Sequence, residues 1–176
     1  MSKRFLVVVD MQNDFVTGAL GTPEAAAIAD AVVRRASSFD GEVVFTLDTH
    51  FDNYLNTQEG KNLPVPHCIR KSEGWQLIPE LEKLRAERSY LVFEKPAFGS
   101  IDLMNYLAQC DAYEPIESIE LIGVCTDICV MSNALLIKAA LPEIPVIVDS
   151  ALCAGVTPEA HEAALATMRS CQVEVR

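Results

Sequence analysis

Phe5-Leu-Val-Val-Val9 is an uninterrupted apolar run that stops at a carboxylate, Asp10. Such a run is typical of a strand that is buried on both faces of a parallel sheet. Further apolar runs follow along the chain, and stretches with a helical pattern separate them. The pattern predicts further strands at residues 42–48, 90–94, 118–123, 145–149 and 172–175. It predicts helices at residues 23–37, 77–85, 101–109, 127–140 and 157–170, the first of them capped by Thr22.

This alternation implies parallel strands joined by helical crossovers. We therefore predict a three-layer α/β/α fold, with a mainly parallel six-stranded sheet and helices on both faces. The chain has 176 residues, of which 50% are hydrophobic and 22% are charged. A chain of this size buries about 70% of its unfolded surface. We expect one domain over residues 1–176, with a lid-like loop at about residues 49–76.

The net charge, the lengths of the apolar runs and the number of cysteines argue against a nucleic-acid-binding, a membrane-spanning or a disulfide-rich secreted protein. The net charge of −11 disfavours binding to nucleic acid. No apolar stretch approaches the roughly 18 residues that a membrane helix needs, and the first apolar run is too short for a signal peptide. Six dispersed cysteines predict free thiols in a reducing compartment rather than a disulfide framework, so we expect a cytoplasmic protein.

Chemically useful side chains occur where the predicted strands end. They are Asp10, the pair Asp48 and His50, Lys95, and the segment 123–129, which contains two cysteines. Open α/β sheets bind their ligands beyond the carboxyl ends of the strands. A single acid at such a position is more often a helix cap or a solvated residue. An acid, a lysine and a thiol at three strand ends together predict an active site.

Cys129 is the candidate nucleophile. It is predicted to lie in the first turn of a helix, and a helix N-terminus or a nearby lysine lowers the pKa of a thiol. Lys95 would stabilise the thiolate, and Asp10 would accept its proton. The alternative is a buried structural cysteine. We expect the other five cysteines to be packing residues and His161 to be an exposed residue in the middle of a helix.

The long connection between residues 49 and 76 contains a second group of polar residues. A loop of this length in a compact domain is usually functional. Two carboxylates and two imidazoles suit a divalent ion such as zinc, manganese or iron, and they are provided by Asp48, His50, Glu59 and His67. The alternative is that all four are solvated loop residues. Cys68 follows His67 directly, and we expect it to point away.

Four segments, in this order, resemble the isochorismatase-like cysteine hydrolase superfamily, and within it the nicotinamidase/pyrazinamidase branch. They are Val8-Val-Asp10-Met-Gln-Asn-Asp-Phe15, Asp48-Thr-His50 with Pro64-Val-Pro-His67-Cys68, Lys95-Pro-Ala-Phe98-Gly-Ser, and Gly123-Val-Cys125-Thr-Asp-Ile-Cys129-Val. The resemblance covers nearly the whole chain. Because the segments keep the order of the family, their combination is far more specific than any one of them.

The resemblance implies a mechanism. Asp10 is the general base, Lys95 favours the charged forms, and the thiolate of Cys129 attacks an amide carbonyl to form a thioester and release ammonia. It also implies a cis peptide bond before Cys125, and an oxyanion hole formed by the backbone N–H groups of Cys125 and Cys129. Phe15 would line the substrate ring. In nicotinamidases the metal binds the pyridine nitrogen and does not attack the carbonyl.

Two departures from the family bear on the substrate. Many nicotinamidases carry a second histidine soon after the Asp-x-His pair; here none follows, and Glu59 is the matching candidate. Many also have an aromatic residue where this chain has Leu63. Two positions stay open for the side chain of Trp75: it lines the substrate pocket, or it packs at the base of the loop or in a subunit contact.

Nicotinamide hydrolysis to nicotinate is the activity that the resemblance implies. The alternatives are another hydrolase of the superfamily, acting on a carbamoyl or ureido compound or an isochorismate-type vinyl ether, and a non-catalytic binding or regulatory protein. The metal group argues against the first alternative and the complete catalytic set against the second. A dinucleotide-binding enzyme is excluded because no G-x-G-x-x-G follows the first strand. The resemblance also implies a homo-oligomer, either a dimer or a tetramer.

Overall fold

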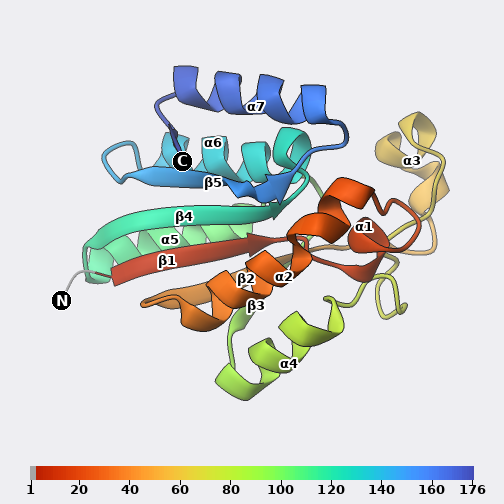
Figure 1. Cartoon of the computed structure of the whole chain (residues 1–176), viewed down its shortest axis with the longest axis horizontal. Coiled ribbons are helices and arrows are strands. Elements are labelled where there is room, and N and C mark those ends of the chain that lie inside the picture. Colours follow the sequence, from red (N-terminus) through yellow and green to blue (C-terminus); the bar gives the residue numbers. More distant parts are fainter. Residues whose placement is uncertain (1–2) are drawn as a thin grey trace.

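The computed structural model describes residues 3–176; Met1 and Ser2, the first residues of the predicted domain, lie outside this range. Figure 1 shows a central twisted sheet with helices on both sides. All strand pairs in the described chain are parallel, and the strand order is β3-β2-β1-β4-β5-β6. The predicted fold is confirmed. The strands are β1 (Lys3–Val9), β2 (Glu42–Asp48), β3 (Leu91–Lys95), β4 (Ile116–Val124), β5 (Val146–Ala154) and β6 (Glu174–Val175).

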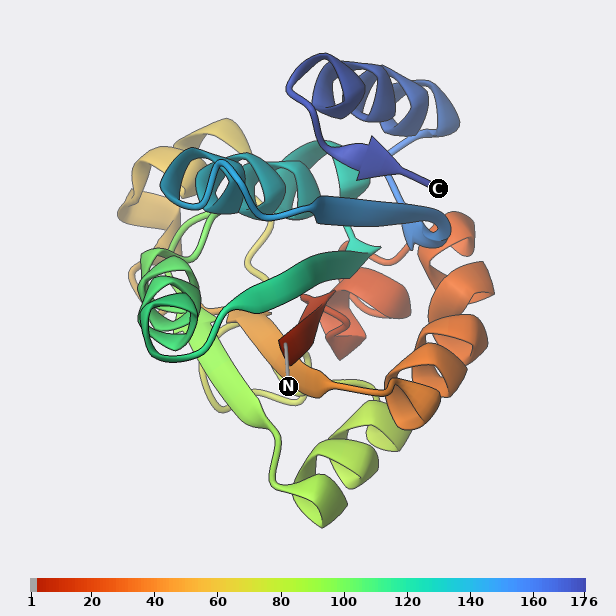
Figure 2. The same cartoon turned by 90° about the vertical axis from the view of Figure 1, so that its left-hand side faces the viewer.

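Helices form the two outer layers. Figure 2 shows α2 and α4 against one face of the sheet and α5 and α6 against the other. The helices are α1 (Asn13–Val16), α2 (Pro23–Ser38), α3 (Gln58–Asn62), α4 (Pro79–Arg88), α5 (Ile101–Tyr113), α6 (Met131–Ala140) and α7 (Pro158–Ser170), and two short turns are η1 (Tyr54–Asn56) and η2 (Thr126–Val130). The predicted cap is present, because the Thr22 hydroxyl accepts the N–H of Ala25.

The alternation of side chains along β1 explains the two layers. Phe5, Val7 and Val9 pack in one hydrophobic core, and Leu6 and Val8 pack in the other. All five are fully buried. Successive side chains of a strand point to opposite faces, so an unbroken apolar run requires cover on both sides. β1 therefore lies at the centre of the sheet.

The predicted helix at residues 127–140 begins differently in the structure. Its first turn is the π-helical turn η2, in which the N–H of Val130 donates to the carbonyl of Cys125. The regular helix α6 begins only at Met131. α6 therefore has 10 residues, and α2, with 16, is the longest helix in residues 3–176. This π-helical turn carries Cys129 at the end of β4, and single π-helical turns occur frequently at functional sites.

The connection at residues 49–76, predicted as a lid-like loop, contains the turn η1 and the short helix α3. The Thr57 hydroxyl caps α3 by accepting the N–H of Gly60. Both ends of the loop are held together, because the His50 N–H donates to Cys68 and the Arg70 N–H donates to His50. No helix in residues 3–176 is long and apolar enough to cross a membrane.

The strand register brings the polar strand ends together at one edge. Asp48 pairs with Lys95 across β2 and β3, and Val9 pairs with Gly123 across β1 and β4. Gly123 has a φ of 117°, and a Cβ atom there would lie 2.2 Å from the carbonyl oxygen of Val9. Only glycine permits this backbone and this close approach. The residue thus lets β4 lie close to β1 just before η2.

Candidate active site

Lys95 is the centre of a buried cluster at the carboxyl edge of the sheet. Its Nζ lies 2.7 Å from Oδ2 of Asp10 and donates to Sγ of Cys129 at 3.3 Å. It also donates to the carbonyl of Ala97 at 3.1 Å. The three side chains of Asp10, Lys95 and Cys129 are at most 5% exposed. The structure therefore brings together the three residues predicted from separate strand ends.

Asp10 is held by the strand beside it. Its φ is 48°, a left-handed conformation that Asp and Asn adopt more readily than most residues. Its N–H donates to the carbonyl of Thr46, and the Thr46 hydroxyl donates to Oδ1 at 2.7 Å. The other carboxylate oxygen faces Lys95. The carboxylate is thus fixed in direction, with one oxygen toward the lysine and the thiol.

Burial and the neighbouring charges set the protonation of the cluster. Burial raises the pKa of Asp10, against the charge of Lys95. Burial disfavours the charge of Lys95, but the negative groups of Asp10, Cys129 and Asp48 outweigh it and raise its pKa. Burial, followed by the charge of Asp10, raises the pKa of the Cys129 thiol well above its usual value, against Lys95. The predicted lowering of this pKa is wrong for the resting protein, because burial outweighs the lysine.

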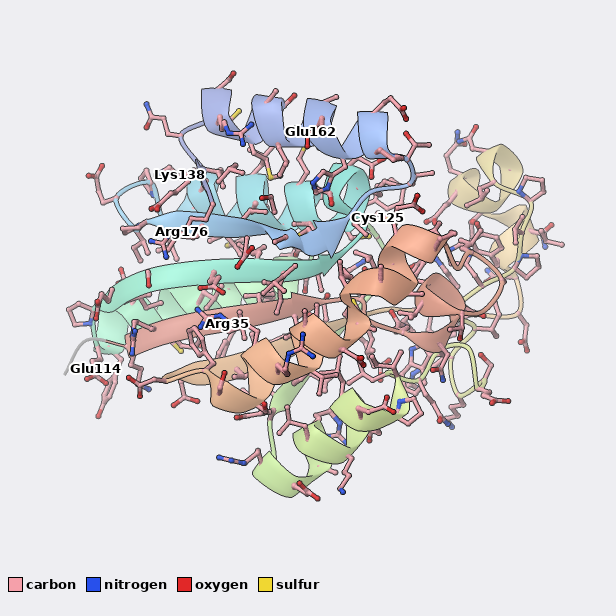
Figure 3. All side chains as sticks on the ribbon, in the orientation of Figure 1. Arg35, Glu114, Cys125, Lys138, Glu162 and Arg176 are labelled. Carbon is pink, nitrogen blue, oxygen red and sulfur yellow. The ribbon has the colours of Figure 1, made fainter. Side chains whose placement is uncertain are left out.

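Backbone geometry fixes the turn that carries the thiol. The peptide bond between Val124 and Cys125 is cis, as the resemblance implied. The N–H groups of Ile128 and Val130 both donate to the carbonyl of Cys125. Figure 3 shows Cys125 where β4 ends, on the side of the molecule where α1 and α3 lie. Cys129 therefore lies in the first turn after the strand.

Two polar side chains tie this turn to its surroundings. Asn133 donates to the carbonyl of Cys129 at 2.8 Å, and its Oδ1 accepts the N–H of Ser100. His161 lies 2.8 Å from the hydroxyl of Thr126, through its Nδ1. His161 was predicted to be an exposed residue in the middle of a helix. Instead it is partly buried near the start of α7, and its contact with Thr126 holds the turn η2 that carries Cys129.

Four further polar side chains form a second cluster beside the first. Nε2 of His50 lies 3.0 Å from Oδ2 of Asp48 and 3.5 Å from Oε1 of Glu59. Nε2 of His67 lies 3.5 Å and 3.7 Å from the same two oxygens. Each residue offers one ligand atom, and all four ligand atoms lie within 4.8 Å of one another. The two clusters touch, because Lys95 Nζ lies 3.4 Å from Oδ1 of Asp48.

These spacings fit a metal ion. Ligands that bind zinc at about 2.1 Å in a tetrahedron are separated by about 3.4 Å. The four histidine–carboxylate distances lie between 3.0 and 3.7 Å. Nδ1 of His67 lies 2.8 Å from the carbonyl of Val65, which accounts for the Nδ1–H proton and leaves Nε2 as the ligand. The four predicted ligands therefore form one site suited to a divalent ion.

Charge also favours a cation at this place. Burial raises the pKa of Asp48, but the neighbouring imidazoles of His50 and His67 and the charge of Lys95 outweigh it and lower the pKa. Burial lowers the pKa of His50, but the hydrogen bonds and charges of Asp48 and Glu59 raise it to about 9. Two buried imidazoles facing two carboxylates are a typical donor set for a divalent transition metal.

The sequence did not indicate two residues that support this cluster. The Gln12 side chain accepts the N–H of Asp48 and donates to its carbonyl, and it also donates to the carbonyl of Trp75. The ring of Tyr54 packs against His50 and His67, with centroid distances of 4.7 and 5.1 Å. Gln12 was detectable, because it lies two residues after Asp10 at a strand end. Tyr54 was not, because only the folding of the loop places it.

Trp75 lies at the base of the loop rather than in the cavity. Its indole N–H donates to the hydroxyl of Thr49 at 2.9 Å, and its ring packs against the core beneath. The six cysteines are free, as predicted. The assignment of the other five as packing residues is wrong for Cys171, which is exposed. Cys125 packs against one of the two cores and also lines the cavity. Burial raises the pKa of Cys125 to about 12.

One cavity of about 740 Å³ connects the two clusters. Cys129 and the four candidate metal ligands contribute to its wall. Phe15 also lines it, with its ring edge-to-face to His67 at 5.5 Å. The cavity thus offers a thiol, a site for a cation and an aromatic wall. This combination can bind a small planar molecule and attack one of its electrophilic carbons.

Comparison with known proteins matches the whole chain. The isochorismatase domain family covers residues 4–176. The nicotinamidase/pyrazinamidase of Mycobacterium tuberculosis is 30% identical over 189 residues, which span 98% of this chain and 97% of that protein. A crystal structure of nicotinamidase/pyrazinamidase from Bacillus subtilis superposes with a TM-score of 0.85 at 28% identity, over 98% of both chains. The pyrazinamidase of Pyrococcus horikoshii in complex with zinc superposes with a TM-score of 0.81 at 26% identity, over 99% of this chain and 98% of that one.

Proposed function

The chain belongs to the isochorismatase family, and on that premise we propose that it is a cysteine amidohydrolase that converts nicotinamide to nicotinate and ammonia. The observation that carries this proposal is one cavity, lined both by Cys129 of the Asp10–Lys95–Cys129 cluster and by the Asp48–His50–Glu59–His67 cluster. An amide needs a nucleophile at its carbon. A pyridine ring needs a partner for its nitrogen, and the second cluster provides a place for one.

The first half of the reaction uses the buried cluster. Asp10 takes the proton of the Cys129 thiol as sulfur attacks the carboxamide carbon. Lys95 stabilises the charged forms of the Asp10 carboxylate and of the Cys129 sulfur. The raised pKa of the thiol fits a proton transfer that accompanies the attack, with no free thiolate at rest. The backbone N–H groups of Cys125 and Cys129 donate to the carbonyl oxygen as it becomes an oxyanion. The C–N bond then breaks, and Asp10 returns the proton to the departing ammonia.

The second half regenerates the thiol. Asp10 takes a proton from water, and the hydroxide attacks the thioester carbon. The C–S bond breaks, the thiol regains its proton from Asp10, and the acid leaves as nicotinate after losing its own proton to solvent. The whole chain, including the loop at residues 49–76, acts as a single catalytic domain in this proposal, with the loop closing one side of the cavity.

The second cluster holds the ring. Asp48, His50, Glu59 and His67 would bind a divalent metal ion, for which zinc is the proposed identity, and a zinc complex of a related pyrazinamidase supports it. When bound, the ion supplies a Lewis acid for a ring nitrogen. Phe15 lies against His67 and is proposed to pack on the ring face. These residues orient the amide toward Cys129.

The test is ammonia release from nicotinamide and from benzamide, which lacks the ring nitrogen, with the metal content of the same sample. We expect turnover of nicotinamide and a poor reaction with benzamide. Chelation, or Glu59→Ala, should lower kcat/KM for nicotinamide by about 100-fold and change benzamide comparatively little. Equal losses for the two amides would contradict the role assigned to the second cluster. The absence of ammonia from nicotinamide would refute the proposed function.

A further inference from the structure

The cavity is larger than nicotinamide needs. Its volume is about 740 Å³, within the roughly 300–1,000 Å³ of pockets that hold drug-sized ligands. Nicotinamide has nine non-hydrogen atoms, far fewer than such ligands. Much of the cavity therefore lies beyond a bound nicotinamide.

The residues that line the cavity fall into two groups by burial: a buried floor and an exposed mouth. Cys129, Asp48, His50 and His67, which would hold the two ends of the substrate, are at most 6% exposed. Three apolar side chains of the same cavity are strongly exposed: Leu63 at 39%, Phe98 at 45% and Val156 at 48%. They come from three separate connections, after α3, after β3 and before α7. These three side chains form an apolar rim on part of the mouth, from parts of the chain that are distant in sequence, beside the exposed polar residues Gln58 and Asn62.

The geometry of the pyridine ring shows which edge faces this rim. The ring nitrogen and the carbon that carries the carboxamide are meta to each other, and C2 lies between them. If both are held at the buried floor, C2 faces the floor and C5, directly across the ring, faces the mouth. A substituent on C5 leaves both anchoring groups free, whereas a substituent on C2 collides with the floor.

We propose that the site accepts nicotinamides that carry an apolar substituent on C5, and that Leu63, Phe98 and Val156 form the subsite for it. This inference rests on the proposed function and extends it to a substrate class. A phenyl group on C5 would cover apolar side chains that are otherwise open to water, which favours its binding. The rim is the specificity-determining part of the cavity, separate from the groups that react.

The experiment compares kcat/KM for nicotinamide, 5-phenylnicotinamide and 2-phenylnicotinamide. We expect the 5-phenyl amide to react within about tenfold of nicotinamide and the 2-phenyl amide at least about 100-fold more slowly, because it clashes with the floor. The double variant Leu63→Ser/Val156→Ser should lower kcat/KM for 5-phenylnicotinamide by about tenfold and leave nicotinamide within about twofold. Leu91→Ser is the matched control, because Leu91 is 47% exposed on β3 and is not part of the cavity wall.

A second readout needs no turnover. The product 5-phenylnicotinate should bind more tightly than nicotinate in calorimetry, with a more negative heat-capacity change from the apolar area it covers. The double variant should remove both differences.

The possible failures are distinguishable. If nicotinamide reacts but the 5-phenyl amide is as slow as the 2-phenyl amide, the rim is closed, for example by a second copy of the chain, and the inference is overturned while the proposed function stands. If the 5-phenyl amide reacts but the double variant treats it as the wild type does, the assigned residues do not form the subsite. If no amide releases ammonia, the proposed function fails, and this inference fails with it.

Discussion

Replacing Asp10 by Asn should separate the two effects of this carboxylate on Cys129. The variant keeps the shape of the side chain, and Asn tolerates the φ of 48° at this position. An amide oxygen can still accept the hydroxyl of Thr46. The variant therefore removes one buried negative charge and one proton acceptor, with little change in structure. We expect the thiol to become more reactive while amide hydrolysis is lost.

The magnitude follows from the distances around Lys95. Its Nζ lies 2.7 Å from Asp10 Oδ2 and 3.3 Å from Cys129 Sγ, so these two atoms are no more than about 6 Å apart. At an effective dielectric constant of about 20, two charges 6 Å apart repel by about 2.8 kcal/mol, or about 2 pKa units. Removing the carboxylate should therefore lower the pKa of Cys129 by about 2 units, since the strongest neighbouring negative charge is lost while Lys95 remains.

The assay is the rate of alkylation by iodoacetamide between pH 5 and 10, with modification of Cys129 followed by peptide mass spectrometry, because the exposed Cys171 also reacts. At pH 7 a thiol whose pKa lies above 7 in both proteins should react about 100-fold faster in the variant. Hydrolysis of nicotinamide should fall by about 100- to 10,000-fold, the usual loss when an acid–base group is removed. In Asp10→Asn/Lys95→Met, alkylation should slow again.

Asp149→Asn is the control, because Asp149 lies on β5 and is not part of the cavity wall. It should leave both rates unchanged. Slower alkylation in Asp10→Asn would refute the reasoning, because it would mean that Asp10 already activates the thiol in the free protein. Faster alkylation with full hydrolysis would remove Asp10 from the proton transfers.

Three further predictions concern other parts of the site. Cys129→Ala should abolish hydrolysis with an unchanged circular dichroism spectrum, whereas Cys125→Ala should keep substantial activity because only its N–H is needed; the reverse result would mean that the nucleophile is Cys125. Gln12→Leu should weaken zinc binding by about 10- to 100-fold in calorimetry, because Gln12 holds the backbone N–H and carbonyl of Asp48. The control Asn13→Ala loses only an exposed hydrogen bond to the carbonyl of Glu73 and should bind zinc as the wild type does. Equal zinc affinities of the two variants would show that Gln12 has no effect on the metal site. Gly123→Ala should lower the free energy of unfolding by about 2 kcal/mol or more, because of its left-handed φ and the 2.2 Å approach to Val9, and an unchanged midpoint in urea would contradict that explanation.

Local patterns were sufficient for the elements and their order. The apolar run at residues 5–9 defines a strand covered on both sides, since its side chains alternate between the two cores. The bounds of β2 were predicted without error, because Gly41 before it and the charged ends Glu42 and Asp48 delimit the run. Helix α2 was predicted within one residue, because Thr22 and Pro23 specify its start. These features depend on neighbours in sequence.

The π-helical turn before α6 and the extent of β5 were not predictable in the same way. The turn η2 is set by Cys125, whose carbonyl accepts two N–H groups, and by the contact of Thr126 with His161, 35 residues later. β5 continues to Ala154 because its second half pairs with the end of β4, although its own residues alternate weakly. Both depend on partners that are distant in the sequence.

In the candidate site, too, some features follow from the local sequence and others depend on contacts between distant segments. The sequence alone predicted which residues would meet at the site, because the residue types at the ends of parallel strands lie at one edge of the sheet. It did not determine their protonation, since the pKa of Cys129 depends on burial and on Asp10 as well as on Lys95. Nor did it show that Glu59 reaches His50, or that three exposed apolar side chains lie together at the mouth of the cavity. Those features depend on how the loop at residues 49–76 folds back over the sheet, and only contacts between distant segments specify that path.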